Sequence, residues 1–325
     1  MEPVLKARIA GIEYALPRKI ELLEDFRRDN PDWDLAKIFE KTGIRQRYIS
    51  APDQTAADLC CEAAEKIFAS GEVAREEIDG VLFCTQSPDY ALPTTACILH
   101  ERLKLPKRTA AFDFNLGCSG FVYGLAIAAS MLNSALLQTV LLLCGDTYTK
   151  YIDPHDRTCR PIFSDGGSAT LLRWHPEPSL GPFDLGTDGS GYRNLIVPDS
   201  GARGKGPGPG TLHMEGAAVF LFTLDAVPRC VDVLLKRAEL SVEEIDLFVF
   251  HQASRVVLEA IVKKMGLPAE KVLVDLESIG NTVSATIPIA LKRAAEAGRL
   301  KSGQRVLLLG FGVGYSWGGC LVQWV

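Results

Sequence analysis

The stretch AFDFNLGCSGFVYGLAIAASML, residues 111–132, decides how this chain folds. Its first residues alternate between apolar and polar from Phe112 to Asn115, which predicts a strand. The stretch then becomes an almost unbroken apolar run without proline, which predicts a buried helix. Cys118 lies at the turn between the strand and the helix, with glycines close on both sides. This residue is either a buried structural thiol, the usual role of a free cysteine, or a nucleophile at a helix N-terminus.

The composition is that of a globular protein whose core is large enough for two domains. The 325 residues are 47% hydrophobic and 23% charged, and a net charge of −5 without a basic stripe argues against nucleic-acid binding. No uninterrupted apolar run is long enough to cross a membrane, and the N-terminus has no apolar core of signal-peptide length. The nine cysteines, an odd number without a CxxC pair, favour the reducing cytoplasm over a disulfide framework or a zinc site.

The chain contains an internal repeat. REEIDGVLFCTQS at 75–87 resembles VEEIDLFVFHQAS at 242–254, and TVLLLCG at 139–145 resembles RVLLLGF at 305–311. The two pairs occur in the same order and at nearly the same offset, which indicates that half of the chain has been duplicated. Each half alternates strands and helices, so we predict an α/β fold with sheets buried between helices.

The predicted halves meet where proline and glycine cluster, in HPEPSLGP at 175–182. We therefore expect an N-terminal half over residues 1–175 and a C-terminal half over residues 176–325. Each half contains a strand-to-helix turn in the region between its two matched segments.

The duplication points to three candidate functional residues. The turn that holds Cys118 corresponds to the turn that holds Asn281 in the second half, and His251 ends a strand of that half. In layered α/β folds, ligands meet the chain at strand ends and helix N-termini. Cys118, His251 and Asn281 are therefore candidates for a single pocket between the halves.

Motifs along nearly the whole chain resemble those of the β-ketoacyl-acyl carrier protein synthases III, a family of the thiolase superfamily. The motifs, which occur in order and at the family's spacing, are KTGIRQRYI (41–49), LPTTACILHERL (92–103), GCSGFVYGL (117–125), DPHDRTCRPIFSDGGSA (153–169), HQAS (251–254), GNT (280–282) and GFGVGYSWG (310–318). The resemblance implies a thiolase-like fold, a layered α-β-α-β-α sandwich of two duplicated βαβαβ-type halves. It also implies a catalytic set of Cys118 in the first half with His251 and Asn281 in the second.

The resemblance implies a decarboxylative Claisen condensation. Cys118 would take an acyl group from acyl-CoA, and the helix N-terminus would favour its thiolate. A malonyl thioester, on acyl carrier protein or a similar carrier, would then lose CO₂ and attack the acyl group to give a β-ketoacyl thioester. His251 and Asn281 would donate to the enolate oxygen, and the backbone N–H groups of Cys118 and Val313 would form the oxyanion hole, although the family usually has glycine at the latter position. Neither a metal nor an organic cofactor is expected.

The resemblance also assigns residues to substrate binding. Those expected to contact CoA, pantetheine or the carrier are Lys41, Trp33, Arg157, Gly216, Phe220, Ser254 and Lys263. Leu92 stands where the family closes the acyl tunnel, often that of the neighbouring subunit, so a homodimer is implied. Leucine is smaller than the phenylalanine that limits chain length there, which predicts longer or branched primers. Leu221 and Val256 replace two usual cations, which predicts a specialised carrier and pathway.

Related families fit the residues less well. Synthases I and II have a second histidine where this chain has Asn281, biosynthetic thiolases have a second cysteine in the C-terminal glycine loop, and chalcone-type synthases have longer chains. Two other functions stay open: an acyltransferase that passes the acyl group from Cys118 to an amine or alcohol, and a non-catalytic partner subunit. Such subunits usually lack the cysteine, whereas this chain retains all three residues.

The glycine-rich segment PDSGARGKGPGPGT at 198–211 could be either a phosphate-binding loop or a mobile loop without a ligand. It lacks the GKS or GKT ending of a phosphate-binding loop and the apolar strand before it, so we predict a mobile loop. The turn that follows resembles the family's entry into the helix beside the pantetheine tunnel, where Gly216 would allow close backbone approach.

Overall fold

Two β-sheets form the framework of the structure, a computed structural model that describes residues 5–204 and 210–325. The first sheet has the strand order β1-β7-β6-β4-β5 and the second the order β11-β12-β13-β8. The strands are β1 (Ala7–Ala15), β4 (Gly80–Cys84), β5 (Ala110–Phe114), β6 (Thr139–Asp146), β7 (Gly166–Trp174), β8 (Leu180–Thr187), β11 (Leu247–Phe250), β12 (Arg305–Gly312) and β13 (Ser316–Gln323). The glycine-rich segment predicted as a loop lies in part, at 205–209, outside the described residues.

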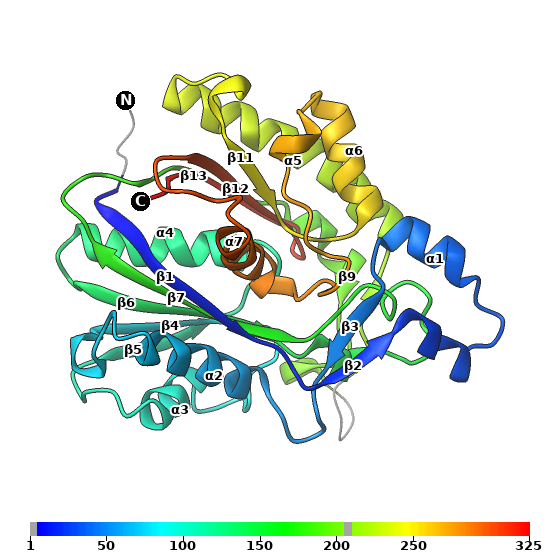
Figure 1. Ribbon diagram of the computed structural model, residues 1–325. Coiled ribbons are helices and arrows are strands. Elements are labelled where there is room, and N and C mark those ends of the chain that lie inside the picture. Colours follow the sequence, from blue (N-terminus) through cyan, green and yellow to red (C-terminus); the bar gives the residue numbers. More distant parts are fainter. Residues whose placement is uncertain (1–4, 205–209) are drawn as a thin grey trace.

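Helices fill the space between the sheets and cover both outer faces. Figure 1 shows α4 (Gly120–Asn133) and α7 (Thr286–Glu296) between the sheets. The outer face of the first sheet is covered by α2 (Ala56–Ala69) and α3 (Thr95–Arg102), and that of the second by α5 (Gly216–Ala238) and α6 (Arg255–Met265). The five layers confirm the predicted α-β-α-β-α sandwich.

The central helix α4 explains the long apolar run of its sequence. Its side chains Phe121 and Leu125 are fully buried in a cluster that includes Leu142 of the first sheet and Leu308 of the second. A helix between two sheets has no solvent-facing side, so it is apolar all around. A Cβ at Gly124 would lie 2.6 Å from a Leu142 methyl carbon, so a glycine allows the close approach of helix and sheet at this position.

The predicted duplication is visible in the topology. The order β1-β7-β6-β4 of the first sheet corresponds to the order β8-β13-β12-β11 of the second. The fifth position is occupied by β5 in the first sheet and only by a single parallel bridge between Phe248 and Val272 beside the second. The boundary proposed at residue 175 falls in the connection between β7 and β8.

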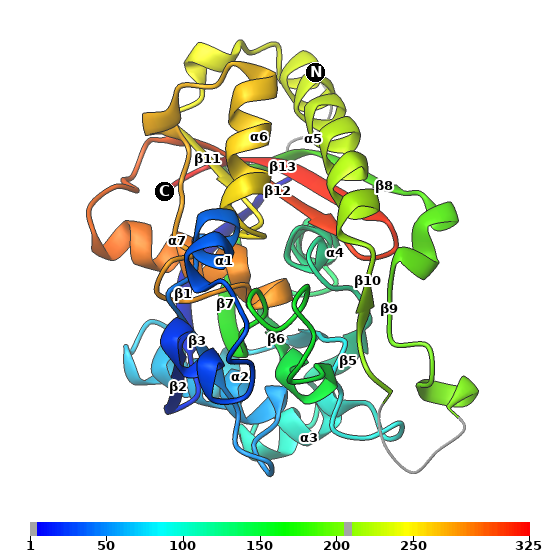
Figure 2. The ribbon, with the colours of Figure 1, turned by 90° about the vertical axis from the view of Figure 1, so that its right-hand side faces the viewer.

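Smaller elements surround the edge where the two halves meet. They are α1 (Leu35–Thr42), β2 (Lys19–Leu22), β3 (Gln46–Ile49), β9 (Leu195–Ile196) and β10 (His213–Met214). Helix α1 packs against α6, and β9 pairs with β10 close to the start of α5 (Figure 2). Among the described residues, no helix is both long and apolar enough to span a membrane.

Candidate active site

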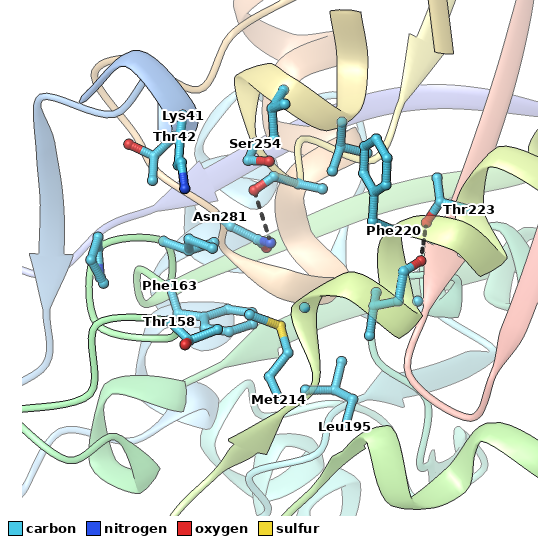
Figure 3. A pocket seen from close by; sticks show the side chains of 18 of the residues that line it. Lys41, Thr42, Thr158, Phe163, Leu195, Met214, Phe220, Thr223, Ser254 and Asn281 are labelled. Atoms are coloured by element: carbon cyan, nitrogen blue, oxygen red, sulfur yellow. Dashed lines mark hydrogen bonds between the residues drawn. The ribbon is translucent and has the colours of Figure 1, made fainter. Parts of the chain in front are cut away.

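A cavity of about 510 Å³ lies between the two halves and is lined by residues of both. Its outer part is formed by α1, α5 and α6, and its wall includes Phe163, Leu195 and Met214 (Figure 3). The three residues singled out by the repeat, Cys118, His251 and Asn281, all line it. The structure thus brings together side chains that are far apart in the sequence.

Cys118 lies in the turn between β5 and α4, directly before Ser119, the N-cap of that helix. The end of β12 passes very close to this turn. A Cβ at Gly310 would lie 2.4 Å from the Cys118 carbonyl oxygen, and one at Gly312 would lie 2.8 Å from the sulfur. Two glycines of the C-terminal motif are therefore needed so that this strand can reach the nucleophile.

Val313 follows this close contact, and its backbone N–H, together with that of Cys118 itself, acts to lower the pKa of the Cys118 thiol. These are the two donors expected for an oxyanion hole. A Cβ at Gly117 would lie 2.6 Å from Val313 Cγ1, so the glycine at position 117 makes room for the valine side chain. This contact explains how a valine is accommodated where the family usually has glycine.

Burial dominates the acidity of the nucleophile. It raises the pKa of the Cys118 thiol to about 12, against the opposing effect of the Val313 and Cys118 N–H groups. The helix N-terminus had predicted a thiolate, but in the free protein desolvation of the charge outweighs the backbone donors, and the thiol is protonated near neutral pH.

This acidity predicts a steep pH dependence for alkylation of Cys118. Below its pKa the thiolate fraction grows about tenfold per pH unit, so the rate with iodoacetamide should still rise about tenfold between about pH 9.5 and 10.5. A thiol with an ordinary pKa of about 8.5 is mostly ionised by about pH 9.5, and its rate levels off there. The measurement is the loss of unmodified Cys118 peptide with time at each pH. A plateau below about pH 8 would show that the free protein holds a thiolate.

His251 directly follows β11 and is fixed on several sides. Its backbone N–H donates to the Leu309 carbonyl oxygen at 2.9 Å, and its ring meets the Phe311 ring edge-on at 5.6 Å. Nδ1 lies 2.7 Å from Oγ1 of Thr286, the first residue of α7. Burial lowers the pKa of His251 to about 3, so the imidazole is neutral near pH 7.

Asn281 is held in a turn that is bonded to the first half. Its backbone N–H donates to the Ile162 carbonyl oxygen at 3.0 Å, and its own carbonyl oxygen accepts from the Ser164 N–H at 2.9 Å. Its side-chain Oδ1 accepts from the Val283 N–H at 2.9 Å. Nδ2 is 3.3 Å from His251 Nε2 and faces the cavity (Figure 3).

Asp146 is a buried residue of this region that the sequence did not reveal. It ends β6, is completely buried, and accepts from the Gln86 N–H at 2.8 Å and from the Ser284 hydroxyl at 2.5 Å. Burial raises its pKa to about 7. Because Ser284 lies three residues after Asn281, this carboxyl group ties the second-half turn to a strand of the first half. The only sign of Asp146 in the sequence is an aspartate at the end of an apolar strand.

The residues assigned to CoA and carrier binding divide into two groups. Those that line the cavity are Lys41, Arg157, Gly216, Phe220 and Ser254. A Cβ at Gly216 would meet only a Thr158 methyl carbon, at 3.7 Å, so packing within the protein does not require this glycine.

Three assigned residues lie outside the cavity lining. Lys263 is exposed on α6. Trp33 is only 6% exposed and packs edge-on against Phe26, with the Arg157 guanidinium 5.9 Å from its ring. The cation–π contact links Trp33 to the cavity-lining Arg157, and a role of Trp33 in binding CoA stays a prediction. Leu92 is 83% exposed and does not reach the cavity of its own chain.

The two apolar residues that stand in place of the expected cations are both exposed. Val256 lines the cavity and is 44% exposed, and Leu221, on α5 next to the lining residue Phe220, is 67% exposed. The neighbouring Arg255 lies over the Phe39 ring, 4.6 Å from its centre. This contact holds the Arg255 side chain against α1.

A layered α/β fold whose duplicated halves bring a cysteine, a histidine and an asparagine to one cavity defines a condensing enzyme of the thiolase type. Comparisons with known proteins narrow this class. The family model described as 3-oxoacyl-[acyl-carrier-protein] synthase III matches residues 112–189, and that of its C-terminal part matches residues 235–324. The chain belongs to the 3-oxoacyl-acyl carrier protein synthase III family.

Individual relatives are similar over almost their whole length. A β-ketoacyl-[acyl-carrier-protein] synthase III of Syntrophomonas wolfei is 36% identical over 330 residues, covering 98% of each chain. A crystal structure of a 3-oxoacyl-(acyl-carrier-protein) synthase III has 46% identity and a TM-score of 0.95, covering 98% of this chain and 100% of the other. The priming β-ketosynthase of the R1128 polyketide pathway has 29% identity and a TM-score of 0.91, covering 100% and 98%.

Proposed function

We propose that this protein condenses an acyl group from acyl-CoA with a malonyl thioester, releasing CoA and CO₂ and forming a β-ketoacyl thioester. The observation that carries the proposal is the convergence of Cys118, His251 and Asn281 on one cavity of about 510 Å³. The activity is that of the family to which the chain belongs.

The first half-reaction transfers the acyl group to sulfur. The Cys118 sulfur attacks the thioester carbonyl of acyl-CoA, the bond to the CoA sulfur breaks, and the thiol proton of Cys118 ends on CoA. The tetrahedral intermediate carries an oxyanion next to the sulfur. The N–H groups of Cys118 and Val313 both act to lower the pKa of the Cys118 thiol, which supports their role as its donors.

The second half-reaction forms the carbon–carbon bond. The malonyl thioester loses CO₂, and the electron pair of the broken bond forms an enolate whose charge lies on the thioester oxygen. His251 and Asn281 donate hydrogen bonds to that oxygen. The enolate carbon attacks the acyl carbonyl, and the Cys118 thiolate leaves. Thioester acidity and CO₂ loss drive the reaction, so no metal or organic cofactor takes part.

The carrier of the malonyl group is an acyl carrier protein or a related donor of a specialised pathway. The cations Lys41 and Arg157 in the cavity lining support binding of an anionic CoA or carrier. The exposed apolar side chains of Leu221 and Val256 support a partner that depends less on charge than the usual acidic carrier does.

The working unit is a homodimer in the cytoplasm. Leu92 is exposed in its own chain, and β5 is an edge strand of the first sheet, which supports contact of this region with a second copy. The second copy's leucine would then close the acyl tunnel. All nine cysteines are free thiols, which supports a reducing compartment.

The test is a turnover assay in which both substrates are varied. A panel of acetyl-, butyryl-, isobutyryl- and hexanoyl-CoA is offered with malonyl on CoA, on a fatty-acid carrier protein and on other carriers. We expect CO₂ and β-ketoacyl product in equal amounts, with primers longer than acetyl preferred by about tenfold or more, since one or two methylenes change binding by about 1–3 kcal/mol. Acyl transfer to an amine or alcohol without CO₂ release would overturn the condensation, and a clear preference for acetyl-CoA would overturn the primer prediction.

A further inference from the structure

The ring nitrogen of His251 that faces away from the cavity, Nδ1, has a single side-chain hydrogen-bond partner among the described residues. Nδ1 lies 2.7 Å from Thr286 Oγ1, and the same hydroxyl oxygen lies 3.1 Å from the Val283 carbonyl oxygen. His251 is 2% exposed and Thr286 is 3% exposed, so water does not compete for these contacts. The one hydroxyl proton of Thr286 therefore goes either to the ring or to the carbonyl group.

The two distances show which acceptor takes that proton. Hydroxyl-donated hydrogen bonds are shortest, at about 2.7–2.8 Å, whereas N–H donors are most often at about 2.9–3.0 Å. The 2.7 Å contact with Nδ1 is ordinary for a hydroxyl donor and short for a ring N–H. The 3.1 Å contact with Val283 is long for a hydroxyl donor. In the alternative arrangement Nδ1–H would donate to Thr286 Oγ1 and the Thr286 hydroxyl to the Val283 carbonyl oxygen. The two distances favour donation from Thr286 to Nδ1, which would leave the ring proton of neutral His251 on Nε2.

The Asn281 amide is oriented independently of the histidine. Its Oδ1 accepts from the Val283 N–H at 2.9 Å, which fixes the amide so that Nδ2 is beside His251. One Nδ2 hydrogen is directed at the Ala253 carbonyl oxygen, at 3.5 Å (Figure 3). The separation of 3.3 Å between Nδ2 and Nε2 is long for a direct hydrogen bond between them, so the second Nδ2 hydrogen is left for another acceptor. Two N–H donors at this separation instead suit one oxygen atom placed between them on the cavity side.

We infer that Thr286 is a positioning residue that holds His251 as the Nε2–H tautomer, so that His251 and Asn281 donate together to one thioester oxygen of the malonyl donor. The inference rests on the proposed function for the identity of that oxygen. Thr286 lies at the first position of α7, and its hydroxyl needs no contact with substrate to act. Removal of the hydroxyl leaves Nδ1 without a partner in a buried site, so neither the tautomer nor the ring orientation is fixed.

The experiment compares Thr286→Val, which keeps the shape but removes the hydroxyl, with Thr286→Ser, which keeps it. The matched control is Thr170→Val, because the Thr170 hydroxyl is buried in β7 and has no hydrogen-bond partner among the residues that the structure describes. For Thr286→Val we expect CO₂ release to fall about 10–100-fold, the effect found for hydrogen-bond partners that orient metal-ligating histidines, with acyl loading of Cys118 little changed. Thr286→Ser and Thr170→Val should both stay close to the wild-type rate.

The tautomer itself is read without substrates, by ¹⁵N NMR of the histidine rings. The chain has five histidines, and the His251 signal is identified by its loss in His251→Ala. We expect protonated Nε2 and bare Nδ1 in the wild type and in Thr286→Ser, and a mixture of tautomers in Thr286→Val. Protonated Nδ1 in the wild type, or wild-type CO₂ release in Thr286→Val, overturns the inference. If the protein did not condense at all, the proposed function would fail, whereas the NMR result would still decide the tautomer.

Discussion

Cys118→Ala is expected to abolish covalent uptake of an acyl group from acyl-CoA and, with it, all condensation. Cys118 is the only cysteine among the described residues that line the cavity, and two backbone N–H groups act to lower the pKa of its thiol. Without the sulfur there is no nucleophile to carry the acyl group between the half-reactions. The loss should therefore reach the detection limit, a larger effect than removal of any single hydrogen-bond donor, which costs about 10²–10³.

The measurement is intact-protein mass after incubation with hexanoyl-CoA. The wild type should gain one hexanoyl group, and the variant none. Cys97→Ser is the matched control, because Cys97 is an exposed thiol on α3 that could react non-specifically, and this variant should still gain one group. Equal thermal unfolding of both variants shows that the fold is kept. A label on any other cysteine, with Cys118 unmodified, would contradict the assignment.

The fold and the three residues of the site were predictable because they depend on patterns within each half. Repeated segments revealed the duplication, and the duplication placed the turns of Cys118 and Asn281 in corresponding positions. Alternating and continuous apolar patterns then gave β5 and the buried helix α4, since burial on all sides removes the amphipathic signal.

The features that were not predictable depend on contacts between the halves. Asp146 accepts hydrogen bonds from Gln86 and Ser284, which are far apart in the sequence, and no local pattern marks a carboxyl group with such partners. The sequence shows the helix N-terminus that lowers the pKa of Cys118 but not the burial that raises it more strongly. The packing of Trp33 against Phe26 likewise depends on tertiary contacts that no local pattern shows.

Asn281→Asp is expected to lower CO₂ release from the malonyl thioester by about 10²–10³, the usual cost of one lost donor to a developing oxyanion. The substitution keeps an oxygen that accepts from the Val283 N–H, so the turn stays in place. It replaces Nδ2 by a second oxygen, which as a carboxylate repels the enolate instead of stabilising it. Acyl loading of Cys118 should change little, because the donors of that step are backbone groups.

Comparison with Asn281→Ala separates catalysis from support of the turn. Alanine also removes the acceptor for the Val283 N–H, and a buried donor without a partner costs about 1–3 kcal/mol of stability. Thermal unfolding should therefore report a loss for Asn281→Ala and little for Asn281→Asp, while CO₂ release falls strongly in both. The activity of Asn281→Asp relative to the wild type should rise as the pH falls, since a protonated carboxyl group regains one O–H donor. If Asn281 only held the turn, Asn281→Asp would release CO₂ at the wild-type rate at every pH.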